Sequence, residues 1–299
     1  MRHLAEATQG AVFAHLTKVC PCNISTGIDK ERGQGLSGSH GIIWSMRMRV
    51  SDINDFDQRV GHLVPGWTAR TRPAARPMAG RWCRLEPLDP VRHADDLYQA
   101  NLADERGQMW TYLPYGPFDS VTSYRAWLEG VAGREDPMFF AIINGQGRAV
   151  GVASFLRIDP SAGTIEVGHL AFSPAMQATT AATEAMALMM RTVFDELGYR
   201  RSEWKCDSLN TASRRAAQRL GFVYEGTFRQ AVVVKGRNRD TAWFSITDAE
   251  WPRLAAAYAR WLAPANFDAE GRQRMALSKL TLPDALSAPW PPRTTGSKR

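Results

Sequence analysis

The segment from Thr164 to Gly198 constrains the fold of this chain more than any other. It opens with the run TIEVGHLAF, which is typical of a β-strand, and Pro174 then closes the strand. A loop rich in threonine and alanine follows, and beyond it apolar residues recur at helical spacing up to Gly198, a natural helix stop. The pattern predicts a strand that leads through a loop into a long helix.

The start of that helix allows two interpretations. Several backbone N–H groups at a positive helix terminus have no partner within the helix, so they can bind an anion. Alternatively, Thr179, Thr180 or Thr183 only caps the helix, which is the commoner role of threonine at such a position. The choice depends on the rest of the chain.

Charge and composition exclude several classes of protein. The net charge is +7, but 37 basic residues are mixed with 30 acidic ones and form no long block, so the sequence disfavours a nucleic-acid binder. The excess positive charge suits a small polyanionic ligand. No stretch approaches the roughly 20 apolar residues of a membrane helix, and no signal peptide is recognisable, so we expect a cytoplasmic protein without a membrane partner.

The four cysteines predict neither a disulfide framework nor a metal site. Their spacing lacks a second ligand pair, and we expect packed or bystander thiols and no bound metal. They are Cys20, Cys22, Cys83 and Cys206.

The texture of the sequence changes twice. Residues 1–66 show little periodicity and predict a poorly ordered extension, and GQGLSG within them lacks the preceding strand and following helix of a dinucleotide site. Residues 67–263 alternate between strand and helix patterns and predict one α/β domain of roughly 200 residues. Residues 264–299 predict a tail that is partly helical and then disordered.

Two motifs in the predicted domain carry a resemblance to a known family. QATTAA (177–182) stands at the start of the long helix, and the pattern N…S…RLGF…EG follows with Asn210, Ser213 and Gly221. The motifs and the order of elements resemble the GNAT superfamily of acetyl-CoA-dependent N-acetyltransferases, especially the branch named for enzymes that acetylate ribosomal-protein N-termini. The resemblance implies a central mixed, mostly antiparallel sheet flanked by helices, with strands splayed at the acetyl-CoA site.

The resemblance also implies a binding site for acetyl-CoA as co-substrate. The pyrophosphate would lie on the loop of Gln177, Ala178, Thr179, Thr180, Ala181 and Ala182, and the pantetheine arm would pair with the strand at Leu170, Ala171 and Phe172. Thr180 stands where the family usually has glycine. Backbone amides tolerate many side chains, so we expect the loop to work provided that its φ angles stay negative.

The resemblance further assigns the proton transfers. Many family members protonate the leaving thiolate with a tyrosine, but Ala217 stands at that position, so Ser213 takes the role and Asn210 positions the cofactor arm. Their alternative role is to cap the following helix. Glu166 is our candidate general base, the alternative being a carboxylate paired with an arginine, and His169 is either a buried histidine or a second proton carrier.

The acceptor side is less specific in sequence. Aromatic residues in MWTYLPYGPF (109–118) form either an acceptor wall or core, and Arg237 and Arg239 either meet an acceptor carboxylate or solvate a turn. We expect transfer to a primary amine, on a small molecule or a protein N-terminus, by direct attack in a ternary complex. The alternative is a CoA-binding or regulatory module without turnover. A homodimer stays open.

Overall fold

The computed structural model describes residues 52–282, which fall into two units that divide between Leu63 and Val64. The described part of the first unit holds a short antiparallel hairpin of β1 (Asp52–Ile53) and β2 (Arg59–Val60). Predictions for residues 1–51, which include Cys20 and Cys22, lie outside the described residues. All that follows concerns the second unit.

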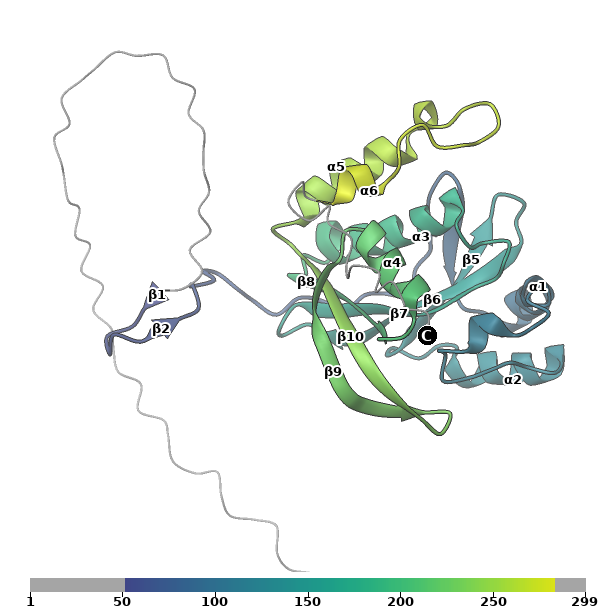
Figure 1. Ribbon diagram of the computed structural model, residues 1–299, viewed down its shortest axis with the longest axis horizontal. Coiled ribbons are helices and arrows are strands. Elements are labelled where there is room, and N and C mark those ends of the chain that lie inside the picture. The colour runs from purple at the N-terminus through teal and green to yellow at the C-terminus, as the bar shows by residue number, and fades with distance from the viewer. Residues whose placement is uncertain (1–51, 283–299) are drawn as a thin grey trace, which may run out of the picture. The chain divides into compact units, whose positions relative to one another are not determined.

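The second unit is built on an eight-stranded sheet with the order β3-β4-β5-β6-β7-β8-β10-β9 (Figure 1). Only the β7–β8 pair is parallel, and the other neighbours are antiparallel. The predicted α/β class with a mixed, mostly antiparallel sheet is therefore confirmed. The strands are β3 (Met78–Ala79), β4 (Cys83–Pro87), β5 (Met138–Asn144), β6 (Ala149–Asp159), β7 (Thr164–Phe172), β8 (Arg201–Asp207), β9 (Val223–Val234) and β10 (Arg237–Thr247).

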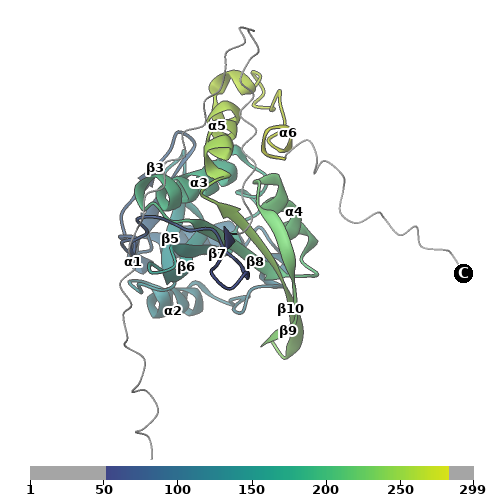
Figure 2. The same cartoon turned by 90° about the vertical axis from the view of Figure 1, so that its left-hand side faces the viewer.

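Helices cover both faces of this sheet. In Figure 1, α3, α4 and α5 lie above it and α1 and α2 lie below, and Figure 2 shows β9 and β10 at the edge opposite β3. The helices are α1 (Pro90–Asn101), α2 (Val121–Val131), α3 (Thr180–Arg191), α4 (Thr211–Arg219), α5 (Trp251–Leu262) and α6 (Ser278–Thr281).

The alternation of side chains along a strand divides the core into two layers. Phe140 and Ile142 of β5 pack with α3 and α5, whereas Phe139 and Ala141 pack with α1 and α2. Every residue of β5 from Met138 to Ile143 is buried, because both faces are covered. A strand of this kind reads as a continuous apolar run, as MFFAIIN does.

The parallel pair β7–β8 separates soon after it forms. Pairing covers only Thr164 to Glu166 of β7 and Arg201 to Glu203 of β8, although the two strands continue to Phe172 and Asp207. A bulge in β7 accompanies the separation: His169 has a φ of 50°, and the pairing with β6 shifts register nearby. The predicted splay is therefore present, and the space between the ends of β7 and β8 is called the gap below.

Some element boundaries differ from expectation. β10 begins at Arg237, so most of KGRNRD belongs to the strand and only Lys235 and Gly236 form the turn. Residues 264–282, in the predicted tail, include α6, and Leu277 and Thr281 are fully buried there. Trp261 of α5 donates from its indole nitrogen to the Gln273 side chain at 2.9 Å.

The glycine of the RLGF motif has a packing role. Gly221 follows α4 with a φ of 95°, in the left-handed region that favours glycine. A Cβ at this position would lie 2.5 Å from Cδ2 of Leu254 in α5. The motif therefore permits the chain to turn from α4 into β9 in close contact with α5.

Candidate active site

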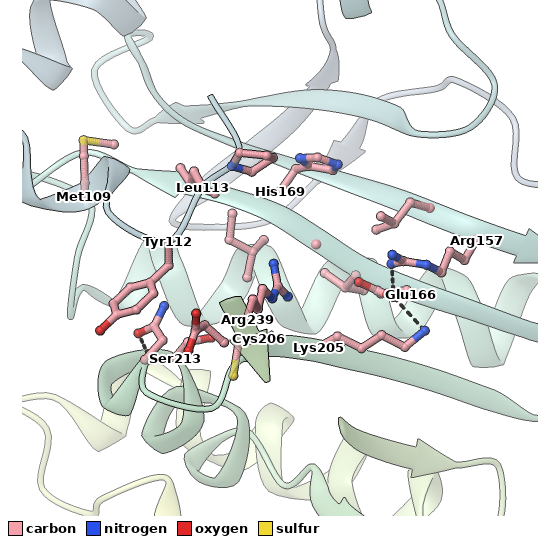
Figure 3. Close-up of a pocket in the computed structure, with 17 residues that line it drawn as sticks. Met109, Tyr112, Leu113, Arg157, Glu166, His169, Lys205, Cys206, Ser213 and Arg239 are labelled. Atoms are coloured by element: carbon pink, nitrogen blue, oxygen red, sulfur yellow. Dashed lines mark hydrogen bonds and ion pairs between the residues drawn. The ribbon is translucent and has the colours of Figure 1, made fainter. Parts of the chain in front are cut away.

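A cavity of about 240 Å³ occupies the gap (Figure 3). Its lining comes from β6, β7, β8 and β10, from the start of α4, and from the segment 109–114 between α1 and α2. Of the residues predicted from the sequence, Glu166, Leu170, Asn210 and Ser213 line this one cavity. The divergence of two parallel strands thus brings together side chains that lie far apart in the sequence.

Glu166 stands where β7 and β8 part, and only 4% of its surface is exposed. Its Oε2 lies 2.6 Å from Nη1 of Arg157 and 3.0 Å from Nζ of Lys205 (Figure 3). Burial raises the pKa of this carboxyl, and the charges of Lys205 and Arg157 oppose that rise. The expected pairing with an arginine is present, and it occurs inside the cavity.

Lys205 connects Glu166 to a second carboxylate. Its Nζ lies 2.7 Å from Glu203 and 3.7 Å from the centre of the Trp243 ring. The lysine side chain is only 6% exposed, so its charge acts on Glu166 with little screening by water. The sequence analysis missed Lys205 and Arg157, whose only signal was alternation: positions 203 and 205 of β8 share a face, opposite the core residues Trp204 and Cys206.

Ser213 lies on the other side of the gap, in the first turn of α4. Its Oγ accepts a hydrogen bond of 2.9 Å from the indole nitrogen of Trp204. Burial raises the pKa of the neighbouring Cys206 thiol, and a hydrogen bond with the Ser213 side chain opposes that rise. The serine hydroxyl is thus already within hydrogen-bonding reach of a sulfur atom in the cavity.

Asn210 combines the two roles that the sequence left open. Its Oδ1 accepts the backbone N–H of Ser213 at 3.0 Å, which is a helix N-cap, and the residue also lines the cavity. Ser213 therefore receives its cap through its backbone, and its side chain is left for the cavity.

The predicted pyrophosphate loop lies at the end of β7, outside the lining of this cavity. Thr179 caps α3 by accepting the backbone N–H of Ala182 at 3.1 Å. Among the described residues, no acceptor engages the backbone N–H of Ala178, Thr180 or Ala181, and the first turn of α3 has no acidic residue. A cap and a set of unpaired amides therefore coexist at this terminus.

One expectation about this loop is wrong. Ala178 has a φ of 58°, so the φ angles do not all stay negative. The left-handed residue is not Thr180, where the family usually has glycine, because Thr180 is already the first residue of α3. The turn that precedes Thr179 instead places the left-handed conformation on Ala178, whose small side chain keeps its cost low.

The three predicted pantetheine residues of β7 differ in their surroundings. Leu170 lines the cavity, whereas Ala171 is buried and pairs with Val152, and Phe172 pairs with Gly151. All three belong to the part of β7 that has lost β8 as its neighbour. Their free strand edge can therefore pair only with a ligand.

Of the aromatic residues predicted as an acceptor wall, only Tyr112 lines the cavity. Trp110 is buried in the core under α1 and α2, and Tyr115 and Phe118 pack against that core. The hairpin of β9 and β10 is fixed to this segment, because Nζ of Lys235 donates to the carbonyl oxygens of Trp110 and Gly116, at 2.8 Å each. The contact closes one side of the cavity.

His169 lines the cavity as a neutral base. Its ring lies 5.7 Å from that of Tyr115 and 5.1 Å from that of Phe139. Burial, with the charges of Arg157 and Arg239 adding to it, lowers the pKa of His169 to about 4. The imidazole is therefore uncharged at neutral pH, as expected of a buried histidine.

Metal and membrane sites were also sought. The described residues contain no group of three or more His, Cys, Asp or Glu side chains arranged to hold a metal ion. Within residues 52–282, no helix is long and apolar enough to span a bilayer.

Comparison with known proteins identifies the family. Residues 83–223 match the family model described as an acetyltransferase (GNAT) domain. A crystal structure of a GCN5-related N-acetyltransferase from Brucella melitensis is 46% identical, covers 73% of this chain and 99% of that one, and superposes with a TM-score of 0.72.

Two further proteins are more distant. The prophage-derived, uncharacterized N-acetyltransferase YokL of Bacillus subtilis is 27% identical over 132 residues, which is 44% of this chain and 73% of YokL. The structure of Mycobacterium smegmatis RimJ in complex with CoA-disulfide is 25% identical, covers 62% of this chain and 90% of RimJ, and has a TM-score of 0.52. With the splayed sheet and the cavity in its gap, these similarities show that the chain belongs to the GNAT acetyltransferase family and is an N-acetyltransferase.

Proposed function

We propose that this enzyme transfers an acetyl group from acetyl-CoA to a primary amine by direct attack within a ternary complex. The observation that carries the proposal is that one cavity, in the gap between β7 and β8, holds a buried carboxylate and a serine hydroxyl on opposite strands. Direct transfer needs a group that accepts the ammonium proton and a group that donates a proton to the leaving thiolate.

The residues at the end of β7 fit the phosphates of acetyl-CoA. The unpaired amides of Ala178, Thr180 and Ala181 lie at the positive end of a 12-residue helix without an acidic residue in its first turn. The free edge of β7 at Leu170–Phe172 would hold the pantetheine arm, and Gln177, Thr179 and Ala182 would shape the loop. When bound, acetyl-CoA supplies the activated acetyl thioester.

Glu166 is proposed as the general base. Its raised pKa brings a carboxylate closer to the basicity that proton abstraction at neutral pH requires. Lys205 and Arg157 keep a usable fraction of it ionised, since each favours the charged form. Glu166 also attracts the cationic form of an amine into the cavity.

Ser213 is proposed as the proton donor to sulfur. Because the indole N–H of Trp204 occupies one lone pair of its oxygen, the hydroxyl is oriented and its own proton is directed elsewhere. Asn210 fixes the turn that carries Ser213 and presents its amide to the cavity, where it would position the cofactor arm.

The proposal is tested by incubating the protein with acetyl-CoA and a panel of amines that includes amino acids, small amines and peptides with free N-termini. We expect release of free CoA thiol above the rate of acetyl-CoA hydrolysis, together with a stoichiometric N-acetyl product. A CoA-binding module without turnover would bind acetyl-CoA in a calorimeter and release no amine-dependent thiol. That result would refute the proposal.

A further inference from the structure

Arg239 places an unpaired positive charge in the active-site cavity. The residue lies on β10 and lines the cavity with Glu166 and Ser213 (Figure 3). Its Nε is buried, and among the described residues no group accepts a hydrogen bond from this guanidinium or lies within ion-pair distance of it. The other cations of the cavity, Arg157 and Lys205, are both paired with Glu166.

The charge of Arg239 reaches both sides of the gap. It contributes, after burial and Arg157, to the lowered pKa of His169 on β7. It also opposes the burial that raises the pKa of Cys206 on β8. Both effects require the guanidinium to lie close to each strand, so it faces the space between them.

The local shape of the β9–β10 hairpin directs Arg239 into this space. Pairing shifts register between Arg239↔Val232 and Thr241↔Phe228, so that β10 advances by two residues while β9 advances by four. Gln230 takes a φ of 50° in the extra segment, and the Asp240 carboxylate accepts its N–H at 2.7 Å. The bulge is therefore held by its own hydrogen bonds, independently of any ligand.

An unpaired guanidinium with a buried Nε is costly unless a ligand supplies its partner. The phosphates of acetyl-CoA have donors of their own at the start of α3, and those residues do not line this cavity. The partner is then an anionic group of the acceptor. A cavity of about 240 Å³ admits a small amine or the first residue of a peptide, so the acid must be close to the amine.

We propose that Arg239 binds a carboxylate of the acceptor, and that the preferred acceptor is an amine carrying a carboxylate close to its amino group. This inference rests on the proposed function, in which the amine of the same molecule faces Glu166. The cavity then presents one carboxylate and one free guanidinium, which match the two charges of such an acceptor. Arg237, the other arginine singled out from the sequence, is exposed and lies outside the cavity lining.

The test compares two acceptors with two variants. The acceptors are an amino acid and its carboxamide, which differ in the carboxylate, and the variants are Arg239→Gln and the matched control Arg237→Gln. We expect Arg239→Gln to lower kcat/KM about 10- to 100-fold for the acid, the usual effect of losing a charge-assisted hydrogen bond, and to leave the amide unchanged. Arg237→Gln should keep the preference of the parent for the acid.

Because each ratio compares the same two acceptors, their difference in amine basicity cancels. An equal loss for acid and amide would overturn the inference and assign Arg239 to the thioester. A loss of CoA affinity in Arg239→Gln, measured by calorimetry, would also overturn it, because the guanidinium would then serve the cofactor.

A second measurement separates this inference from the proposed function. The acid and the amide are titrated calorimetrically into the parent protein and Arg239→Gln, each saturated with CoA. Tighter binding of the acid by the parent alone supports the carboxylate site even if no amine is ever acetylated, which would refute only the proposed function. Equal binding of acid and amide by the parent would refute the carboxylate site.

Discussion

The two strands that border the gap each lead into a helix, but the two junctions offer a ligand different groups. At the start of α3 the cap is the Thr179 side chain, and the backbone amides of Ala178, Thr180 and Ala181 lack acceptors among the described residues. At the start of α4 the cap is Asn210, and the Ser213 side chain lines the cavity. The first junction presents backbone donors, and the second presents side chains.

This difference indicates a division of labour. Backbone amides at a helix terminus bind a phosphate of fixed charge, and they need no particular side chain. Proton transfer needs a titratable or hydroxyl group that a strand or helix turn holds in place. The α3 junction is therefore suited to binding, and the α4 junction, together with Glu166 on β7, is suited to chemistry.

The largest expected effect would come from a carboxylate placed on α3. Ala181→Asp puts a negative charge at the second position of the helix, where it suits the helix dipole and leaves the fold able to form. Facing pyrophosphate at about 4 Å, it should weaken CoA binding on the order of 10³-fold by charge repulsion. Isothermal titration calorimetry with CoA measures the effect.

The matched control is Ala212→Asp, at the second position of α4 and exposed. It introduces the same charge at an equivalent helix position and should leave CoA affinity intact. Equal losses in both variants would mean that the two junctions do not differ in the way described. Unchanged affinity in folded Ala181→Asp would remove the cofactor from α3.

A smaller effect is expected from removing the hydroxyl on α4. Ser213→Ala should lower kcat about 10- to 100-fold, at the weak end of general acid catalysis, while the dissociation constant for CoA stays the same. The N-cap persists, because Asn210 accepts the backbone N–H of residue 213. Full activity in steady-state assays would return Ser213 to a structural role as the acceptor for Trp204.

The smallest effect concerns the two caps. Thr179→Ala and Asn210→Ala should each lower the free energy of unfolding by about 1 kcal/mol, the usual worth of an N-cap. Urea denaturation followed by circular dichroism measures both. A much larger loss for Asn210→Ala would show that its contacts at the cavity stabilise the folded protein beyond the cap.

The sequence predicted most of the fold, because strand alternation, helical spacing and caps are local signals. The strand TIEVGHLAF, the helix that follows it and the RLGF turn all lie where they were expected. The boundaries of β10 were less accurate, since the bulge opposite Gln230 depends on contacts between two strands.

The site was predicted in its motifs and missed in its electrostatics. Asn210 and Ser213 follow a local pattern, so the sequence revealed them. Lys205 and Arg157 bear on function only through Glu166, and that contact exists because β8 and β6 both adjoin β7 in the sheet. Likewise, Trp110 and Tyr112 could not be assigned to core and cavity from spacing, since the segment that carries them is irregular.

The most direct test of the division between the strands is the pH–rate profile of Glu166→Gln beside that of Ser213→Ala. In the parent, activity should fall as the pH drops through the raised pKa of Glu166, because the carboxyl takes up a proton and no longer accepts one from the amine. The acid limb should therefore lie above the usual range of a glutamate.

Glu166→Gln should lower turnover about 10²- to 10⁴-fold at neutral pH and recover at alkaline pH, where free amine is abundant. Ser213→Ala should retain the acid limb of the parent and show no alkaline recovery, because raising the pH supplies no proton to the leaving sulfur. Parallel profiles in the two variants would contradict the assignment of proton acceptance to β7 and proton donation to α4.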